Sequence, residues 1–125
     1  MGSSGTVTRA QAWPMFIEKT GNVDSLQSLF VTASGTVAGY GKRPLSRNGY
    51  RPTILLRNVR VSLLPDVVID HVWIDNTNAL GAALLGTTIY FMGKIKEYAP
   101  PKFTFRDLEK LKRIHFHARS ASHTK

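Results

Sequence analysis

Apolar and polar positions alternate most clearly in residues 87–98. Apolar or small side chains occupy every second position: Ile89, Phe91, Gly93 and Ile95. The intervening positions hold Tyr90, Met92, Lys94, Lys96 and Tyr98. Because the side chains of a strand point alternately to its two faces, this pattern predicts a strand with one face towards a core. The other face mixes aromatic rings with lysines, which is typical of a binding surface but also of a solvated barrel wall.

A second β-rich segment precedes this strand at residues 67–74, and a stretch rich in Ala and Leu lies between the two. Asp75 or Asn76 is suited to cap a helix of about ten residues there, and Gly86 is suited to end it. The pattern therefore predicts a strand, a helix and a strand in that order.

Two earlier strands are predicted at residues 29–40, where Gly35 and Gly39 favour a bend, and at residues 53–61. Between them, residues 41–52 are predicted to be a loop, with Asn48 and Gly49 as its turn. A last strand is expected in residues 102–118 and is favoured near 113–117. Residues 107–113 are compatible with either helix or strand.

Three strands, a helix and two further strands is the order of the OB-fold. We therefore predict an all-β fold: a five-stranded OB-fold Greek-key barrel over residues 28–118, with one short helix between strands 3 and 4. Residues 1–27 are expected to be a flexible leader. Its apolar cluster at 13–17 is either a docking arm, which packs on the barrel or on a neighbouring subunit, or a disordered extension. Residues 22–27 are expected to form a short helix or turn, and 119–125 a disordered basic tail.

The charge distribution points to a polyanionic partner. The chain of 125 residues has 17 Lys and Arg against 8 Asp and Glu, a net charge of +9. The excess lies in two blocks, residues 41–60 with six bases and no acid, and residues 94–125 with nine bases and three acids. Two such blocks on one face would attract nucleic acid. The alternative is a basic surface that only keeps the protein soluble.

Other classes of protein are disfavoured by composition. No apolar run approaches the roughly 18 residues that a membrane span needs, and no signal peptide is evident, so we expect a cytoplasmic protein. With no cysteine in the chain, disulfides and thiolate metal sites are excluded. We predict no cofactor and no small-molecule substrate.

Several residues in the middle half of the chain match one pattern. They are Asp70, His71 and Trp73, followed by Phe91, Lys94, Lys96 and Tyr98. This pattern resembles that of small OB-fold-like proteins from bacterial plasmids, phages and conjugative elements, although Thr87 and Thr88 stand where an acidic residue is usual. The resemblance implies an OB-fold-like domain that binds single-stranded nucleic acid.

Candidate binding residues follow from this interpretation. Bases would stack on exposed aromatic rings, for which the candidates are Tyr40, Tyr50, Tyr90, Tyr98 and Trp73. Trp73 is also compatible with a core position. Contacts with phosphates are assigned to Lys42, Arg43, Arg47, Arg51, Arg57, Lys94 and Lys96. Strict alternation would place Arg57 and Arg60 on opposite faces of their strand.

No catalytic or metal site is predicted. Asp70 and His71 are adjacent, so in a regular strand they point to opposite faces and cannot hydrogen-bond without a bulge. His115 and His117 share a face, but a closed metal site is improbable without cysteine or nearby carboxylates. No phosphate-binding loop, nucleophile elbow or dinucleotide fingerprint is present.

The sequence thus predicts a non-enzymatic protein that binds single-stranded DNA or RNA, with DNA favoured, in the replication or transfer of a mobile element. Self-association is compatible with this function. The alternative is an OB-fold adaptor that binds a protein or host factor, with residues 13–17 as its apolar patch. A small enzyme would need a pocket with a strongly perturbed carboxylate or histidine.

Overall fold

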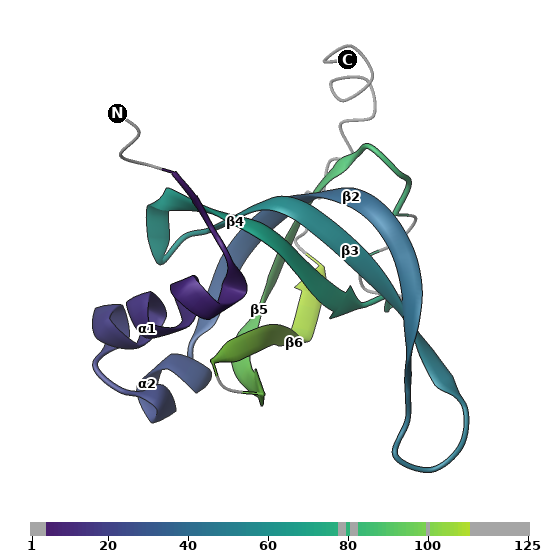
Figure 1. The fold of residues 1–125 in the computed structure, drawn as a ribbon, viewed down its shortest axis with the longest axis horizontal. Coiled ribbons are helices and arrows are strands. Elements are labelled where there is room, and N and C mark those ends of the chain that lie inside the picture. The colour runs from purple at the N-terminus through teal and green to yellow at the C-terminus, as the bar shows by residue number, and fades with distance from the viewer. Residues whose placement is uncertain (1–4, 78–79, 81–82, 100, 111–125) are drawn as a thin grey trace.

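The computed structural model describes residues 5–77, 80, 83–99 and 101–110. The helices and strands are β1 (Thr6–Val7), α1 (Arg9–Thr20), α2 (Val23–Gln27), β2 (Phe30–Pro44), β3 (Tyr50–Val61), β4 (Leu64–Asp75), β5 (Thr88–Ala99) and β6 (Lys102–Lys110). The strands form one mixed sheet in the order β1-β4-β3-β2-β5-β6, in which β1 runs parallel to β4 and the other neighbours are antiparallel. This sheet curls into an open half-barrel (Figure 1).

The predicted five-stranded closed OB barrel is therefore wrong. The sheet has six strands, and both helices precede β2. Among the described residues between β4 and β5, none belongs to an α-helix. Asp75, a predicted helix cap, instead ends β4, where its carboxylate accepts hydrogen bonds from Arg43. Leu80 is fully buried in this connection.

Helix α1 belongs to the fold, although its residues were predicted to be a flexible leader. Thr8 caps the helix in a reciprocal pair with Gln11, and Phe16 is completely buried. The rings of Phe16 and Phe103 meet edge to face with centroids 5.1 Å apart, and Trp13 stacks on Phe103 at 6.3 Å. The apolar cluster at 13–17 therefore packs on the sheet of its own chain. The short helix expected before the first strand is present as α2.

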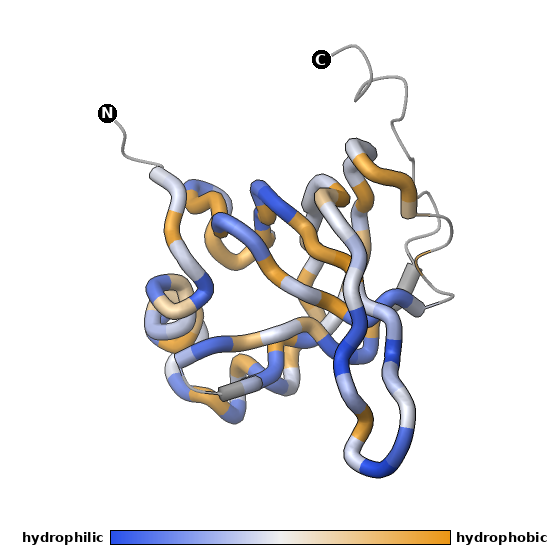
Figure 2. Tube along the Cα trace, turned by 45° about the vertical axis from the view of Figure 1, so that its right-hand side comes forward, coloured by the Kyte–Doolittle hydropathy of each residue, from blue (hydrophilic) through white to orange (hydrophobic). Residues whose placement is uncertain are grey.

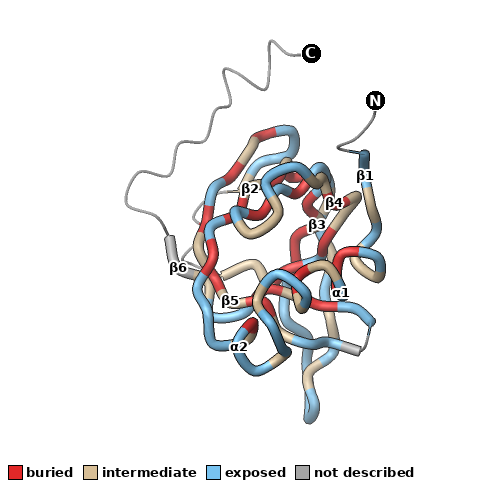
Figure 3. Tube along the Cα trace, turned by 90° about the vertical axis from the view of Figure 1, so that its left-hand side faces the viewer, coloured by how far each residue is buried: buried red, intermediate tan, exposed pale blue. Residues whose placement is uncertain are grey.

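Strand β5 confirms the predicted alternation. Its buried positions are Ile89, Phe91, Gly93 and Ile95, as the sequence indicated. Figure 3 shows buried positions alternating with exposed ones along the strands. Gly93 allows β6 to pack closely, because a Cβ at this position would lie 2.8 Å from the end of the Leu108 side chain and 3.1 Å from the Arg106 carbonyl.

Strict alternation fails at a bend that β3 and β4 share, one of several irregularities in the sheet. Asn58 has a φ of 53°, and the buried positions of β3 switch parity there, from Leu56 to Val59. Arg57 and Arg60 are consequently both exposed, not on opposite faces as predicted.

The same switch occurs on β4, where Ile69 and Val72 are both buried. Asp70 and His71 between them are therefore both partly exposed, and His71 Nδ1 lies 2.9 Å from Asp70 Oδ2. This hydrogen bond was excluded only for a regular strand, and the strand is irregular at this position. Among the described residues, no group of three or more His, Cys, Asp or Glu residues could hold a metal ion.

Residues 41–52, predicted to be a loop, mostly extend β2 and β3 into a long hairpin. Its turn is at the predicted place: Gly49 has a φ of 86°, and the Leu45 N–H donates to the Gly49 carbonyl at 3.0 Å. Figure 2 shows this hairpin projecting from the body of the protein as a largely hydrophilic arm. At the C-terminal end, residues 107–110 are part of β6, whereas the strand favoured at 113–117 and the tail at 119–125 lie outside the described residues.

Candidate functional site

A cleft of about 250 Å³ lies where the end of β4 approaches β6, on the open side of the half-barrel. We call it the β4–β6 cleft. Its lining comes from α1 and five strands and consists of Arg9, Gly41, Lys42, Arg43, Thr53, Trp73, Ile74, Asp75, Tyr98, Thr104, Phe105 and Arg106. The fold thus brings together residues that are up to 97 positions apart in the chain.

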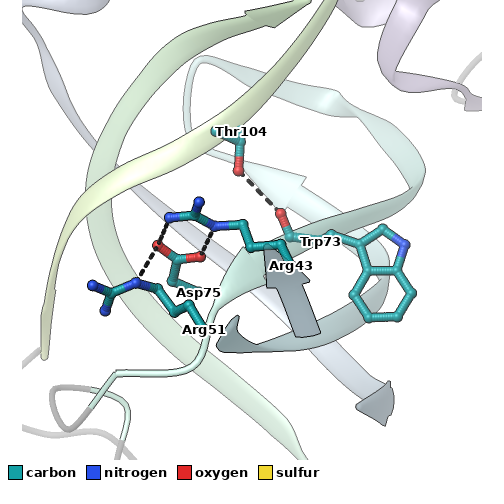
Figure 4. A network of polar contacts seen from close by, with 5 residues as sticks. All are labelled: Arg43, Arg51, Trp73, Asp75 and Thr104. Atoms are coloured by element: carbon teal, nitrogen blue, oxygen red, sulfur yellow. Dashed lines mark hydrogen bonds and ion pairs between the residues drawn. The ribbon is translucent and has the colours of Figure 1, made fainter. Parts of the chain in front are cut away.

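One hydrogen bond ties β4 to β6 across the cleft. The Thr104 hydroxyl donates to the carbonyl of Trp73 at 3.0 Å (Figure 4). The indole of Trp73 lies close to the backbone of β2, because a Cβ at Gly41 would be 3.0 Å from the ring. The side chain nevertheless remains 37% exposed, so it is a wall of the cleft and not part of the core.

The cleft has an excess of positive charge. Four cationic side chains line it, Arg9, Lys42, Arg43 and Arg106, against the single carboxylate of Asp75. Lys42 and Arg43 come from the first basic block of the sequence and Arg106 from the second. The predicted meeting of the two blocks therefore occurs here, through one residue of the second block.

Asp75 organises the base of the hairpin. Its carboxylate accepts two hydrogen bonds from Arg43, at 2.8 and 3.0 Å, and lies 3.9 Å from Arg51 Nε (Figure 4). The hydrogen bonds from Arg43 lower the pKa of Asp75, and the positive charges of Arg43, Arg51 and Arg106 lower it further. Burial of the carboxylate opposes this shift by raising the pKa. The same hydrogen bonds raise the pKa of Arg43. Asp75 thus links β4 to both strands of the hairpin and partly neutralises two of its arginines.

Among the described residues, Arg9 is the cation of the cleft that is both half-buried and without a carboxylate partner. It is half-buried at the start of α1, and its Nη1 donates to the carbonyl of Phe103 at a long 3.4 Å. In the described part of the chain no carboxylate lies within ion-pair distance of it. Burial lowers the pKa of Arg9, and the neighbouring Tyr98 opposes that shift. A guanidinium remains protonated in such surroundings.

Only some of the predicted binding residues meet at this cleft. Four line it: Lys42, Arg43, Trp73 and Tyr98. Three more belong to the adjoining hairpin: Arg47, Tyr50 and Arg51. Lys42 Nζ lies 5.2 Å from the centre of the Tyr50 ring, which joins the hairpin to the cleft.

The other five predicted residues lie elsewhere. Tyr40 donates a hydrogen bond to the carbonyl of Ala83, and Lys94 lies over the ring of Phe30 at 4.9 Å. Arg57 pairs in register with His71. Tyr90 lines a second hollow together with Arg60. Lys96 is the register partner of Thr104 but does not line the cleft.

Sequence reasoning missed Arg9 and Arg106. Arg9 fell in the segment predicted to be a flexible leader, although Thr8 followed by Gln11 three residues later is a capping-box pattern that marks a helix start. Arg106 lay in the segment whose strand was placed seven or more residues too late. Both omissions arose from misplaced elements at the two ends of the chain.

The ion pair at Asp75 makes stability depend on pH. The pKa of Asp75 is lower in the folded protein than its ordinary value of about 3.9. The ionised carboxylate therefore contributes fully to the free energy of unfolding above about pH 3.9, and this contribution is lost as the pH falls from there through the lowered pKa. Asp75→Asn is expected to cost about 1 kcal/mol at pH 7, the upper end for a partly exposed pair. Urea unfolding at several pH values should show this difference narrowing towards about pH 3.

The matched control for this experiment is Asp66→Asn. Asp66 is exposed and forms no ion pair with the described residues, so its replacement should leave stability unchanged at pH 7. A stability difference for Asp75→Asn that stays constant between pH 7 and pH 3 would contradict the role assigned to the carboxylate.

Comparison with known proteins gave no match to a family model, a curated protein or a solved structure. The resemblance to small plasmid and phage proteins therefore stays a prediction. In the part of the chain that the structure describes, no helix is long and apolar enough to cross a membrane.

Proposed function

We propose that this protein binds single-stranded nucleic acid, without catalysing a reaction on it, through the β4–β6 cleft and the hairpin of β2 and β3. The observation that carries the proposal is the combination of two exposed aromatic side chains, Trp73 and Tyr98, with three excess positive charges in one cleft. Proteins that bind unpaired strands combine stacking on aromatic rings with a cationic path for the phosphates.

The size of the cleft favours an unpaired strand. A volume of about 250 Å³ lies just below the usual range for small-molecule pockets, which suits one nucleotide and not a base-paired segment. Trp73 and Tyr98 present ring surface that a base would cover, and their exposed fractions are 37% and 61%.

The hairpin extends this surface away from the body of the protein (Figure 1). No acidic residue occurs between positions 41 and 60, and Tyr50 at the hairpin is 63% exposed. Lys42 belongs to both the cleft and the hairpin, so phosphates that follow the base held in the cleft would continue along the hairpin towards Arg47. Such a path would bind several successive phosphates.

The alternative function, an adaptor that binds another protein, depended on an exposed apolar surface. Its docking surface was the apolar cluster at residues 13–17, but Trp13 and Phe16 are buried against the sheet of the same chain. Nucleic acid therefore remains the partner that the exposed surface suits best. The resemblance noted in the sequence suggests that this binding serves the replication or transfer of a mobile element.

Binding should weaken steeply with salt. Four basic side chains of the cleft and hairpin lack a carboxylate partner among the described residues: Arg9, Lys42, Arg47 and Arg106. If each contacts one phosphate, the log–log slope against salt is about −3, and affinity falls roughly 50-fold between about 50 and 200 mM salt. Fluorescence anisotropy with matched single-stranded DNA, single-stranded RNA and duplex measures this.

The salt series also decides the proposal. Tighter binding of a single strand than of the duplex, with a steep slope, supports it. Lack of binding to either single strand at about 50 mM salt would refute it, because electrostatic attraction is strongest there.

A further inference from the structure

Arg9 has hydrogen-bonding capacity that the protein does not use. A guanidinium carries five N–H donors, and the described residues accept from only one of them, at 3.4 Å. Lys42 and Arg106 are exposed and can be solvated, whereas Arg9 is half-buried. A partly desolvated charge without a carboxylate partner is unfavourable, and an anion in the cleft would remove that cost.

The cleft is bounded by protein on the side of β6. The Thr104 hydroxyl joins β6 to β4, and Arg9 itself reaches the backbone of β6 at Phe103. Figure 1 places α1, which carries Arg9, and the hairpin on opposite sides of the molecule. A strand that arrives along the hairpin and Lys42 therefore reaches the place where the Thr104 hydroxyl joins β6 to β4.

The charge of the cleft suits a phosphate at the end of a strand better than one within it. A phosphodiester carries one negative charge, whereas a phosphate monoester carries between about −1.5 and −2 near pH 7 and has three acceptor oxygens. The lining has three positive charges in excess, and two of its arginines, Arg9 and Arg106, are not bound to a carboxylate in the described part of the chain. Two arginines can together donate to all three oxygens of a monoester.

We propose that the β4–β6 cleft recognises the phosphorylated end of a single-stranded nucleic acid, with Arg9 and Arg106 holding the terminal phosphate monoester and Trp73 or Tyr98 stacking on the terminal base. This inference rests on the function proposed above and adds a preference for strand ends. The ligand chemistry is a phosphate monoester attached to a base through a sugar. Arg9 is the residue that distinguishes this site from a general basic surface.

The test compares one internally labelled oligonucleotide in three forms: with a 5′-phosphate, with a 3′-phosphate, and with hydroxyl groups at both ends. Anisotropy titrations of the full chain should show about tenfold tighter binding of one phosphorylated form than of the hydroxyl form, as expected for an added charge-assisted contact. Arg9→Gln should abolish this difference. Arg106→Gln should reduce it, and because Arg106 is exposed this variant is expected to fold normally.

Arg60→Gln is the matched control, because it removes the same charge at an exposed position outside the cleft. It should retain the full preference for the phosphorylated end. Equal affinity for all three oligonucleotides would overturn the inference while leaving single-strand binding intact, and failure to bind any of them would overturn both. A preference that survives in both Arg9→Gln and Arg106→Gln would overturn the assignment of these residues.

Competition identifies the source of the phosphate. A nucleoside monophosphate should displace the labelled strand at concentrations at which inorganic phosphate has no effect, because only the nucleotide also stacks on the aromatic rings. Equal competition by the two would show that the cleft binds free phosphate, which would contradict recognition of a strand end.

Discussion

Replacing Phe16 with alanine is expected to destabilise the protein by about 3–5 kcal/mol. Phe16 is completely buried, and its ring meets Phe103 of β6 edge to face. The change removes both the buried apolar surface and an aromatic contact, and the site has little freedom to collapse because Trp13 packs on the other side of the contact with Phe103. Since a domain of this size is stable by only about 5–15 kcal/mol, much of the stability would be lost.

Urea unfolding followed by circular dichroism measures this effect. The matched control is Phe30→Ala, which makes the same chemical change at a side chain that is 42% exposed and should cost about 1 kcal/mol or less. If the two variants unfold at the same urea concentration, α1 is not an integral part of the core. The position of Arg9 at the start of that helix would then also be in doubt.

The strands of the sheet were largely predictable, because their signal is local. Ile89, Phe91 and Ile95 alternate with polar positions over a single strand, and that pattern survives in the structure without change. The turn at Asn48 and Gly49 was equally predictable, since it depends on the backbone freedom of Gly49. Period and turn chemistry therefore gave four of the strands in approximately the right places.

The topology was not predictable in the same way, because it depends on contacts between distant residues. Asp75 is of a residue type that often caps helices, but two arginines from the hairpin provide a better partner for its carboxylate. The bend at Asn58 changes which residues of β3 and β4 face the core, and the alternation of apolar and polar residues does not predict this bend. A sheet that ends in β6 also remains open where the OB-fold prediction required closure.

The residues of the candidate site were likewise more predictable where the elements that carry them had been placed approximately correctly. Trp73 and Tyr98 lie in strands whose positions were approximately correct, and both line the cleft. Lys42 and Arg43 were predicted in a loop but belong to the end of β2, and they line the same cleft. Arg9 and Arg106 belong to the terminal elements that were misplaced, so the charge that completes the cleft could not be assigned. Tyr90 and Tyr98 were both assigned from the outer face of the segment 87–98, but Tyr98 lines the cleft and Tyr90 lines a different hollow.

Replacing Trp73 with alanine is expected to weaken binding of single-stranded nucleic acid roughly 5- to 150-fold, the effect of losing one stacked base. The indole is a wall of the cleft, and Gly41 leaves the space that holds it against β2. Trp73→Phe should retain most of the affinity, because a smaller ring still offers a face for stacking. Anisotropy titrations at fixed low salt measure these changes, since phosphate contacts contribute equally to all variants under one condition.

Tyr90→Ala separates stacking in the cleft from a general effect of aromatic residues. Tyr90 is 39% exposed, nearly the same fraction as Trp73, but it lies outside the cleft. Its replacement should leave affinity unchanged within about twofold, the spread expected for a surface substitution away from the site. Equal losses for Trp73→Ala and Tyr90→Ala would mean that bases contact the sheet broadly. A loss for Tyr90→Ala alone would move the binding surface from the β4–β6 cleft to the hollow beside Arg60.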